Sequence, residues 1–195
     1  MKFYDWLNEN KNKIVVCYSG RFQPFHKGHY ETYQNIMKKF GKKNIYITTS
    51  NKVDLPKSPF NFTEKQRIIT KMFKIPINSV VQIKNPYAPT EVLSQYTDDH
   101  SYITIVGKKD ADRLVNGKYF ELYKDGMEML GYKEKGYVWI APENTTKFKG
   151  KTLSGTYVRE LFKEGSEEDK KELFKALYPK FDQGIFELIV NKLGE

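Results

Sequence analysis

Residues 14–40 read IVVCYSGRFQPFHKGHYETYQNIMKKF, and this stretch decides the fold. It opens with a compact apolar and β-branched run, Ile14 to Tyr18, which is typical of a buried strand. From His29 to Phe40 the apolar residues recur at helical spacing and fall on one face. A buried strand that passes through a short loop into a helix is the first half of a βαβ unit, so it predicts a parallel sheet.

The rest of the chain continues this alternation of short apolar runs and helical patterns. We expect further strands at residues 44–50, 80–84, 102–107 and 137–141, with helices between them that are capped by Thr63 and Thr90. The order predicts an α/β fold, a Rossmann-like five-stranded parallel sheet with helices on both faces. Ligands of such sheets bind beyond the carboxyl ends of the strands.

The residues after Pro142 have the pattern of a helical appendage. Ser154 or Thr156 can cap one helix, and Ser166 with Asp169 resembles the capping box of a second. We therefore expect an α/β domain over residues 1–165 and a helical C-terminal tail, residues 166–195, packed on it.

Composition bounds the class of protein. The chain has 195 residues, 39% of them hydrophobic, and its single cysteine, Cys17, excludes an intrachain disulfide. With no secretory signal and no transmembrane run in the sequence, we expect a cytoplasmic protein that does not enter membranes. The net charge of +9 is spread over lysines that have acidic neighbours. This pattern favours a solvated surface over a nucleic-acid partner.

The loop GRFQPFHKGH holds two of the three histidines of the chain. Gly20 allows close backbone approach, and the helix begins near His26, so its first amides can meet an anion. His26 and His29 are three residues apart and share a helix face. Gly28 between them leaves space for a flat ring or a sugar, and Arg21 adds a positive charge. Together these groups predict a cradle for phosphate.

Other interpretations of the two histidines carry less weight. The loop has neither the P-loop pattern G-x-x-x-x-G-K-S/T nor the dinucleotide pattern G-x-G-x-x-G. One histidine could pack in the core while the other lies on the surface. Zinc needs three or four ligands, and only His100 remains beyond the pair, so we assign no metal ligands. A non-catalytic protein that binds nucleotide or nucleic acid stays open as another class.

Two motifs carry a family resemblance. HKGH (26–29) matches the H-x-G-H signature of the nucleotidyltransferase superfamily of adenylyl- and cytidylyltransferases, and GRFQPFHKGH resembles its form in archaeal-type nicotinamide mononucleotide adenylyltransferases. SGTYVR (154–159) is similar to the S-G-T-x-x-R form of the second signature, and SPFNFTEKQR (58–67) resembles a further segment of these enzymes. The resemblance spans roughly residues 14 to 162.

The resemblance implies transfer of AMP from ATP to a phosphorylated acceptor, with release of pyrophosphate. GRFQPFHKGH favours nicotinamide mononucleotide as acceptor, which would give NAD. Phosphopantetheine adenylylation, and cytidylyl transfer from CTP to a small phosphorylated alcohol, stay open. Mg²⁺ would bridge the phosphates. The tail could mediate assembly into a homo-oligomer.

The same resemblance assigns the site residues. The catalytic residues would be His26, His29 and Arg159. The nucleotide-binding residues would be Gly20, Arg21, Phe22, Gly28, Gly107, Asp110, Ser154, Gly155 and Thr156.

Overall fold

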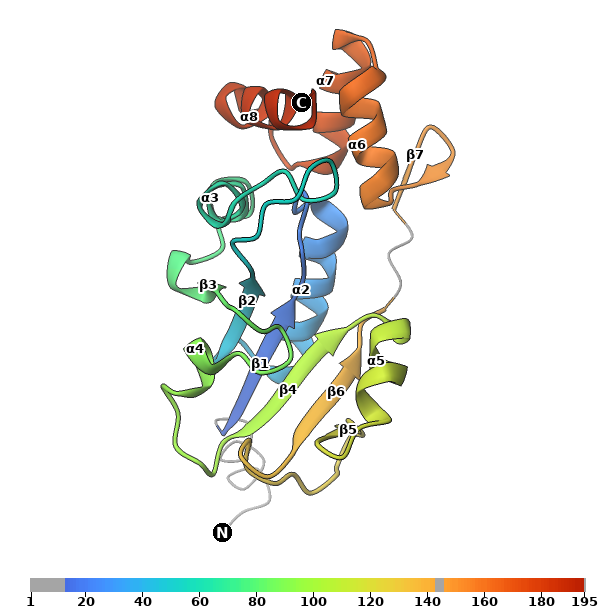
Figure 1. Ribbon diagram of the computed structural model, residues 1–195. Helices are drawn as coiled ribbons and strands as arrows, with labels where there is room; N and C mark the ends of the chain where they lie inside the picture. The colour runs from blue at the N-terminus through green and yellow to red at the C-terminus, as the bar shows by residue number, and fades with distance from the viewer. Residues whose placement is uncertain (1–12, 143–145, 195) are drawn as a thin grey trace. The chain divides into compact units, whose positions relative to one another are not determined.

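The computed structural model describes residues 13–142 and 146–194, in which strands and helices alternate from β1 to β5 and three consecutive helices come last (Figure 1). The first elements are β1 (Ile14–Ser19), α2 (Lys27–Phe40), β2 (Ile45–Thr49), α3 (Phe62–Phe73), a 3₁₀ turn (Ile77–Ser79), β3 (Val80–Gln82), α4 (Thr90–Leu93) and β4 (Ser101–Val106). They are followed by α5 (Lys108–Val115), β5 (Phe120–Leu122), β6 (Gly136–Ile140), β7 (Lys147–Phe148), β8 (Lys151–Thr152), α6 (Gly155–Glu164), α7 (Glu167–Leu177) and α8 (Gln183–Gly194).

The main sheet has six strands in the order β3-β2-β1-β4-β6-β5. The pairs β1–β2, β1–β4, β4–β6 and β5–β6 are all parallel. The expected α/β class and parallel sheet are therefore confirmed, but the strand count of five is wrong. The sixth strand is β5, which has only three residues, and two of them are exposed. Three residues are too few to show an alternation of buried and exposed side chains. The strand is defined by its backbone pairing with β6, which a sequence pattern does not reveal.

Contacts within the chain divide it into two compact units, each made of three separate stretches. Among the described residues, unit 1 comprises 13–20, 33–49 and 81–142, and unit 2 comprises 21–32, 50–80 and 146–194. The division into a domain of residues 1–165 and a tail of residues 166–195 stays a prediction.

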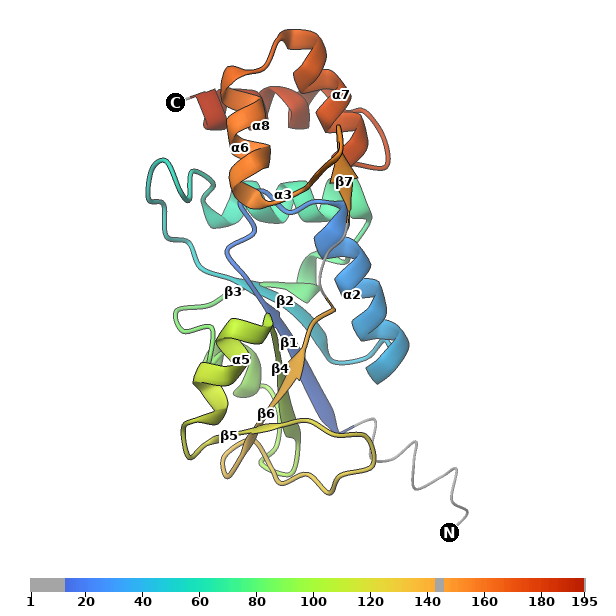
Figure 2. The ribbon, with the colours of Figure 1, turned by 90° about the vertical axis from the view of Figure 1, so that its right-hand side faces the viewer.

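Unit 1 covers both faces of its strands with helical segments. One face carries Val15, Cys17 and Tyr102, which pack with Val92 and Leu93 of α4. Further along the same unit, α5 packs its Ala111 against β4 and β6. Residues 33–40 of α2 lie on the opposite side of the strands from α5 (Figure 2), where Phe40 meets Trp139 with ring centroids 5.7 Å apart. The expected helices on both faces are therefore present.

Unit 2 is mainly helical, and its helices are capped by polar side chains. The Ser154 side chain caps α6, and Ser166 with Asp169 forms the expected capping box of α7. For α3 the predicted cap was wrong, because Asn61 rather than Thr63 caps the helix and forms a capping box with Glu64.

The cap predicted for α4 in unit 1 was also wrong. Thr90 is the first helical residue of α4, and Pro89 precedes it without any side-chain cap bond.

The core of unit 2 is an aromatic cluster contributed by its C-terminal helices. Phe174 lies 4.6 Å from Tyr178 and 5.5 Å from Phe186, measured between ring centroids. The ring of Tyr178 also meets Phe73 of α3 at 5.8 Å. Among the described helices, none is both long enough and apolar enough to cross a membrane.

Candidate functional site

The loop that follows β1 is held in a defined conformation by its own side chains. Phe22 is 4% exposed and has a φ of 47°, in the left-handed region that is uncommon for a residue with a side chain. The buried Gln23 amide accepts from the Phe60 N–H at 2.9 Å and donates to the Phe60 carbonyl at 3.0 Å. Residues 21–26 are therefore fixed against the segment just before α3.

The two histidines of the loop lie side by side at the start of α2. Their ring centroids are 4.0 Å apart. The His26 N–H donates to Nδ1 of His29 at 3.2 Å, and the Gly28 N–H donates to Nδ1 of His26 at 3.2 Å. The expectation that the first amides can meet an anion is therefore wrong for His26 and Gly28, because their N–H groups donate hydrogen bonds to the imidazoles.

These backbone bonds fix the tautomer of both rings. An Nδ1 atom that accepts a hydrogen bond carries no proton, so each neutral ring bears its proton on Nε2. The histidine pair thus offers two Nε2–H donors from one helix start. Donors of this kind suit the oxygens of a phosphate group.

Burial keeps the histidine pair neutral. His26 is 3% exposed, and burial lowers its pKa to about 4. The ring of His29 lies 5.2 Å from that of Phe22 and 5.3 Å from that of Phe25. Burial, and next the neighbouring His26, lower the pKa of His29 well below its usual value. At neutral pH both rings are uncharged hydrogen-bond donors.

The second motif reaches the first within unit 2. The Ser154 side chain accepts the Tyr157 N–H at 3.1 Å and so starts α6. One turn later, Arg159 donates from Nη2 to the Thr156 hydroxyl at 3.3 Å and from Nη1 to the Gln23 carbonyl at 3.4 Å. A Cβ atom at Gly155 would stand 3.2 Å from Nη1, so the glycine leaves room for the guanidinium at the helix start.

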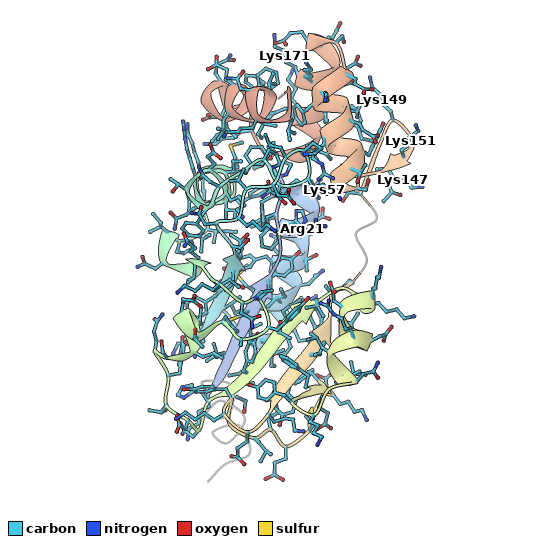
Figure 3. All side chains as sticks on the ribbon, viewed as in Figure 1. Arg21, Lys57, Lys147, Lys149, Lys151 and Lys171 are labelled. Atoms are coloured by element: carbon cyan, nitrogen blue, oxygen red, sulfur yellow. The ribbon has the colours of Figure 1, made fainter. Side chains whose placement is uncertain are left out.

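Positive charge accumulates at this place. The pKa of Arg159 is lowered by its burial and, next, by the charge of Arg21. An anion bound between two guanidinium groups would reduce their mutual repulsion. Figure 3 labels Arg21 among the basic side chains of unit 2, together with Lys57 and Lys151. Neither lysine forms an ion pair with another residue that the structure describes.

The arrangement is chemically suited to a polyphosphate. It supplies neutral N–H donors, guanidinium groups and the start of α6, whose unpaired amides favour an anion. Within residues 13–142 and 146–194, no group of three or more His, Cys, Asp or Glu side chains could hold a metal ion.

The structure brings most of the predicted site residues together in unit 2. These are Arg21, Phe22, His26, Gly28, His29, Ser154, Gly155, Thr156 and Arg159. Three predicted residues belong to unit 1. Gly20 follows β1, Gly107 precedes α5 with open space where a Cβ would stand, and Asp110 pairs with Arg113 of the same helix at 3.1 Å. The role of all twelve residues in binding stays a prediction.

Two residues that support the site were missed by the sequence analysis. Gln23 locks the loop to Phe60, and the Tyr178 hydroxyl donates to the Phe25 carbonyl at 2.9 Å. The position of Gln23 beside Pro24 inside the motif was a usable signal. For Tyr178, which is 153 residues away from Phe25, the sequence held none.

Comparisons with known proteins agree with this fold. A family model described as cytidylyltransferase-like matches residues 17–161. No curated protein sequence matches the chain.

Among solved structures, a bifunctional NMN adenylyltransferase/ADP ribose pyrophosphatase from Francisella tularensis is similar, with a TM-score of 0.57 and 18% identity. The match covers 93% of this chain and 50% of that one, so the chain spans half the length of that protein. A nicotinic acid mononucleotide adenylyltransferase from Plasmodium falciparum has a TM-score of 0.51 and 12% identity, and the match covers 91% of this chain and 94% of that one. At these identities the likeness establishes the fold and confirms the expected Rossmann-like nucleotidyltransferase architecture.

Proposed function

Because the chain belongs to the cytidylyltransferase-like family, we propose that it is an enzyme that transfers a nucleotidyl group from a nucleoside triphosphate to a phosphorylated acceptor. The observation that carries this proposal is that one compact unit holds both the neutral His26–His29 pair and Arg159, which donates to the Gln23 carbonyl of the histidine loop. Each motif alone could serve packing, but together they would supply donors for phosphate from one compact unit.

In the proposed reaction, an oxygen of the acceptor phosphate attacks the α-phosphorus of the triphosphate. A new P–O bond forms there, and the bond from the α-phosphorus to the oxygen that bridges to the β-phosphate breaks. Pyrophosphate leaves with that electron pair. Negative charge builds up on the α-phosphate oxygens, so catalysis needs positioned partners and fixed hydrogen-bond donors rather than a protein nucleophile.

The chain's own residues fit these needs. His29 and His26 donate from Nε2 to the α- and β-phosphate oxygens without changing protonation state during the step. Arg159 and the amides at the start of α6 hold the β- and γ-phosphates, and Arg21 adds charge. The hydrogen bond from Arg159 to the Gln23 carbonyl keeps the guanidinium oriented before substrate arrives.

We propose ATP as the donor and a pyridine mononucleotide as the acceptor. Two similar structures support this choice, since one is named for NMN and the other for nicotinic acid mononucleotide. Mg²⁺, carried in with the triphosphate, would neutralise charge on the phosphate oxygens.

The first experiment measures pyrophosphate release by the full chain with Mg²⁺. ATP and CTP are each combined with nicotinamide mononucleotide, nicotinate mononucleotide and phosphopantetheine. We expect release with ATP and a pyridine mononucleotide, and at least a roughly 100-fold lower rate for His29→Ala with ATP still bound. A folded His29→Ala protein with the full rate would contradict the role of His29.

The same panel tests the rival functions. Turnover with phosphopantetheine or with CTP would keep the mechanism and replace the substrate. A chain that binds ATP but releases no pyrophosphate with any acceptor would overturn the enzymatic proposal and support a nucleotide-binding protein.

A further inference from the structure

A cavity of about 440 Å³ lies within unit 1, away in sequence from both motifs of the proposed site. Its lining includes Tyr87, Tyr119 and Tyr132, together with Leu93, Ser94 and Lys133. The volume is in the range of cavities that hold small molecules, and such cavities typically combine apolar walls with a few polar groups.

The cavity exists because α4 is short. The segment between β3 and β4 forms a single helical turn of four residues, so it covers only part of the sheet face with Val92 and Leu93. Aromatic side chains from the neighbouring loops complete the cover. Tyr119 and Tyr132 pack against this same core cluster from residues before β5 and β6.

The aromatic walls are held in place before any ligand binds. The Arg113 guanidinium stacks over the Tyr87 ring at 5.0 Å and donates to its hydroxyl. The Tyr119 hydroxyl donates to the Tyr132 carbonyl, and the Tyr132 N–H donates to the His100 carbonyl at 2.8 Å. Fixed rings lose little conformational entropy when another ring packs on them.

Lys133 and Ser94 add a cation and a hydroxyl to the lining of the cavity. Lys133 Nζ lies 2.7 Å from Asp98, but both side chains are more than 60% exposed (62% and 63%), so solvent screens this pair. The ammonium group has two further protons to donate. The Ser94 hydroxyl forms no hydrogen bond with any residue that the structure describes.

We infer that this cavity binds a small planar aromatic ring that carries a carboxylate. The ring would stack against the fixed tyrosines, and its carboxylate would accept hydrogen bonds from Lys133 and Ser94. The inference concerns a second site and does not depend on the proposed transfer reaction.

The test uses the full chain with benzoate as the probe and follows the ring-proton signals by NMR titration. We expect saturable benzoate binding that shifts tyrosine ring signals, and about tenfold weaker binding of cyclohexanecarboxylate, which has the charge but not the flat ring. Benzamide, which keeps the ring and lacks the charge, should also bind more weakly.

Variants locate the site. Ser94→Trp should fill the cavity and abolish benzoate binding, whereas Ser94→Ala should weaken it only slightly. Lys133→Gln should weaken benzoate severalfold and leave benzamide unchanged. A heteronuclear spectrum of each variant shows whether it is folded, and Ala88→Trp, at another lining residue, is a second filling variant.

Two results would overturn the inference. One is equal binding of benzoate and cyclohexanecarboxylate, or no binding of either. The other is benzoate binding that survives both filling variants in folded protein.

Discussion

His26 and His29 owe their chemical character to their surroundings. The pKa of His26 is lowered to about 4 by burial, so the folded protein resists protonation of a ring that an unfolded chain protonates near pH 6.5. Their Nδ1 atoms accept hydrogen bonds from backbone amides, so only Nε2 of each ring is left to donate. Each histidine is therefore held as a neutral ring with one defined donor atom.

This burial predicts a pH-dependent stability. Between about pH 4 and pH 6.5 the unfolded chain binds more protons than the folded chain, so stability is full above pH 6.5 and falls as the pH decreases toward 4. From pH 7 to pH 5 we expect His26 to cost about 2 kcal/mol of unfolding free energy. Urea denaturation at a series of pH values measures it.

The slope of stability against pH is the decisive quantity. His26→Asn should flatten the slope whatever its effect on absolute stability. His100→Asn is the control for the loss of a histidine elsewhere. An unchanged slope in the His26 variant would show that this ring is protonated freely in the folded protein.

The contacts of Arg159 lead to a second prediction for a single residue, which concerns ATP affinity. Arg159→Ala removes the guanidinium that spans Thr156 and Gln23, so ATP should bind at least about tenfold more weakly. Acceptor binding should change less. Calorimetric titration with ATP measures the change, and Lys175→Ala, at an exposed lysine of α7, is the matched control. Unchanged ATP affinity would mean that Arg159 of α6 does not bind the triphosphate.

Among the secondary-structure elements, the start of α3 shows how a cap decides a boundary. The helix begins just after Phe60, whose N–H donates to the Gln23 side chain. The position of the helix start therefore affects the histidine loop that contains Gln23. Asn61 accepts the Glu64 N–H at 3.0 Å, and Glu64 accepts the Asn61 N–H at 2.9 Å. This reciprocal pair satisfies two helix amides.

The cap predicts a difference between two nearby variants. Asn61→Ala should destabilise the protein by about 1 kcal/mol because a helix amide loses its acceptor. Thr63→Ala should change stability by less than about 0.5 kcal/mol, as at an ordinary surface position. Thermal unfolding of both proteins decides between the two candidate caps. Equal losses would mean that the threonine shares the capping role.

The sequence could predict the elements whose signal is local. The buried strands and the amphipathic helices follow from apolar spacing, and the caps at Ser154 and Ser166 follow from short-range hydrogen bonding. β5 was missed because backbone pairing with β6, rather than a side-chain pattern, makes it a strand. Asn61 was missed because Asn and Thr both make good caps and sequence alone does not rank them.

For the candidate site, the sequence motifs named residues that fall mostly in one compact unit, but they did not show how those residues are held. The motifs named His26, His29 and Arg159. The hydrogen bonds from backbone amides to the two imidazoles depend on atomic geometry, which the spacing of residues does not specify. The contact from Arg159 to Gln23 joins residues 136 apart, which no local pattern can reveal.

Across the whole molecule, two compact units are interleaved along one chain. Unit 2 unites the histidine loop, α3 and the C-terminal helices from stretches that unit 1 separates in sequence. The aromatic cluster of Phe174, Tyr178 and Phe186 joins the last helices to one another, and the Tyr178 hydroxyl reaches the Phe25 carbonyl. The segment expected to be a tail therefore supports the loop directly.

The hydrogen bond from the Tyr178 hydroxyl to the Phe25 carbonyl predicts how removal of this hydroxyl changes stability. Tyr178→Phe leaves the buried Phe25 carbonyl without its donor, so unfolding free energy should fall by about 1–2 kcal/mol. Urea denaturation measures the loss. Tyr157→Phe is the control, because its hydroxyl bonds to no residue that the structure describes. Equal stability of the Tyr178 variant and the native chain would mean that another donor replaces the phenol.

The reach of Tyr178 back to Phe25 also sets an order of events during protein synthesis. The ribosome delivers the histidine loop early and the aromatic residues of α7 and α8 more than a hundred residues later. Until those residues emerge, nothing in the nascent chain can supply the phenol or the rings that complete unit 2. Contacts so distant in sequence also slow folding. A chain whose translation stops before Tyr178 therefore carries both histidines but lacks the phenol that bonds to their loop at the Phe25 carbonyl.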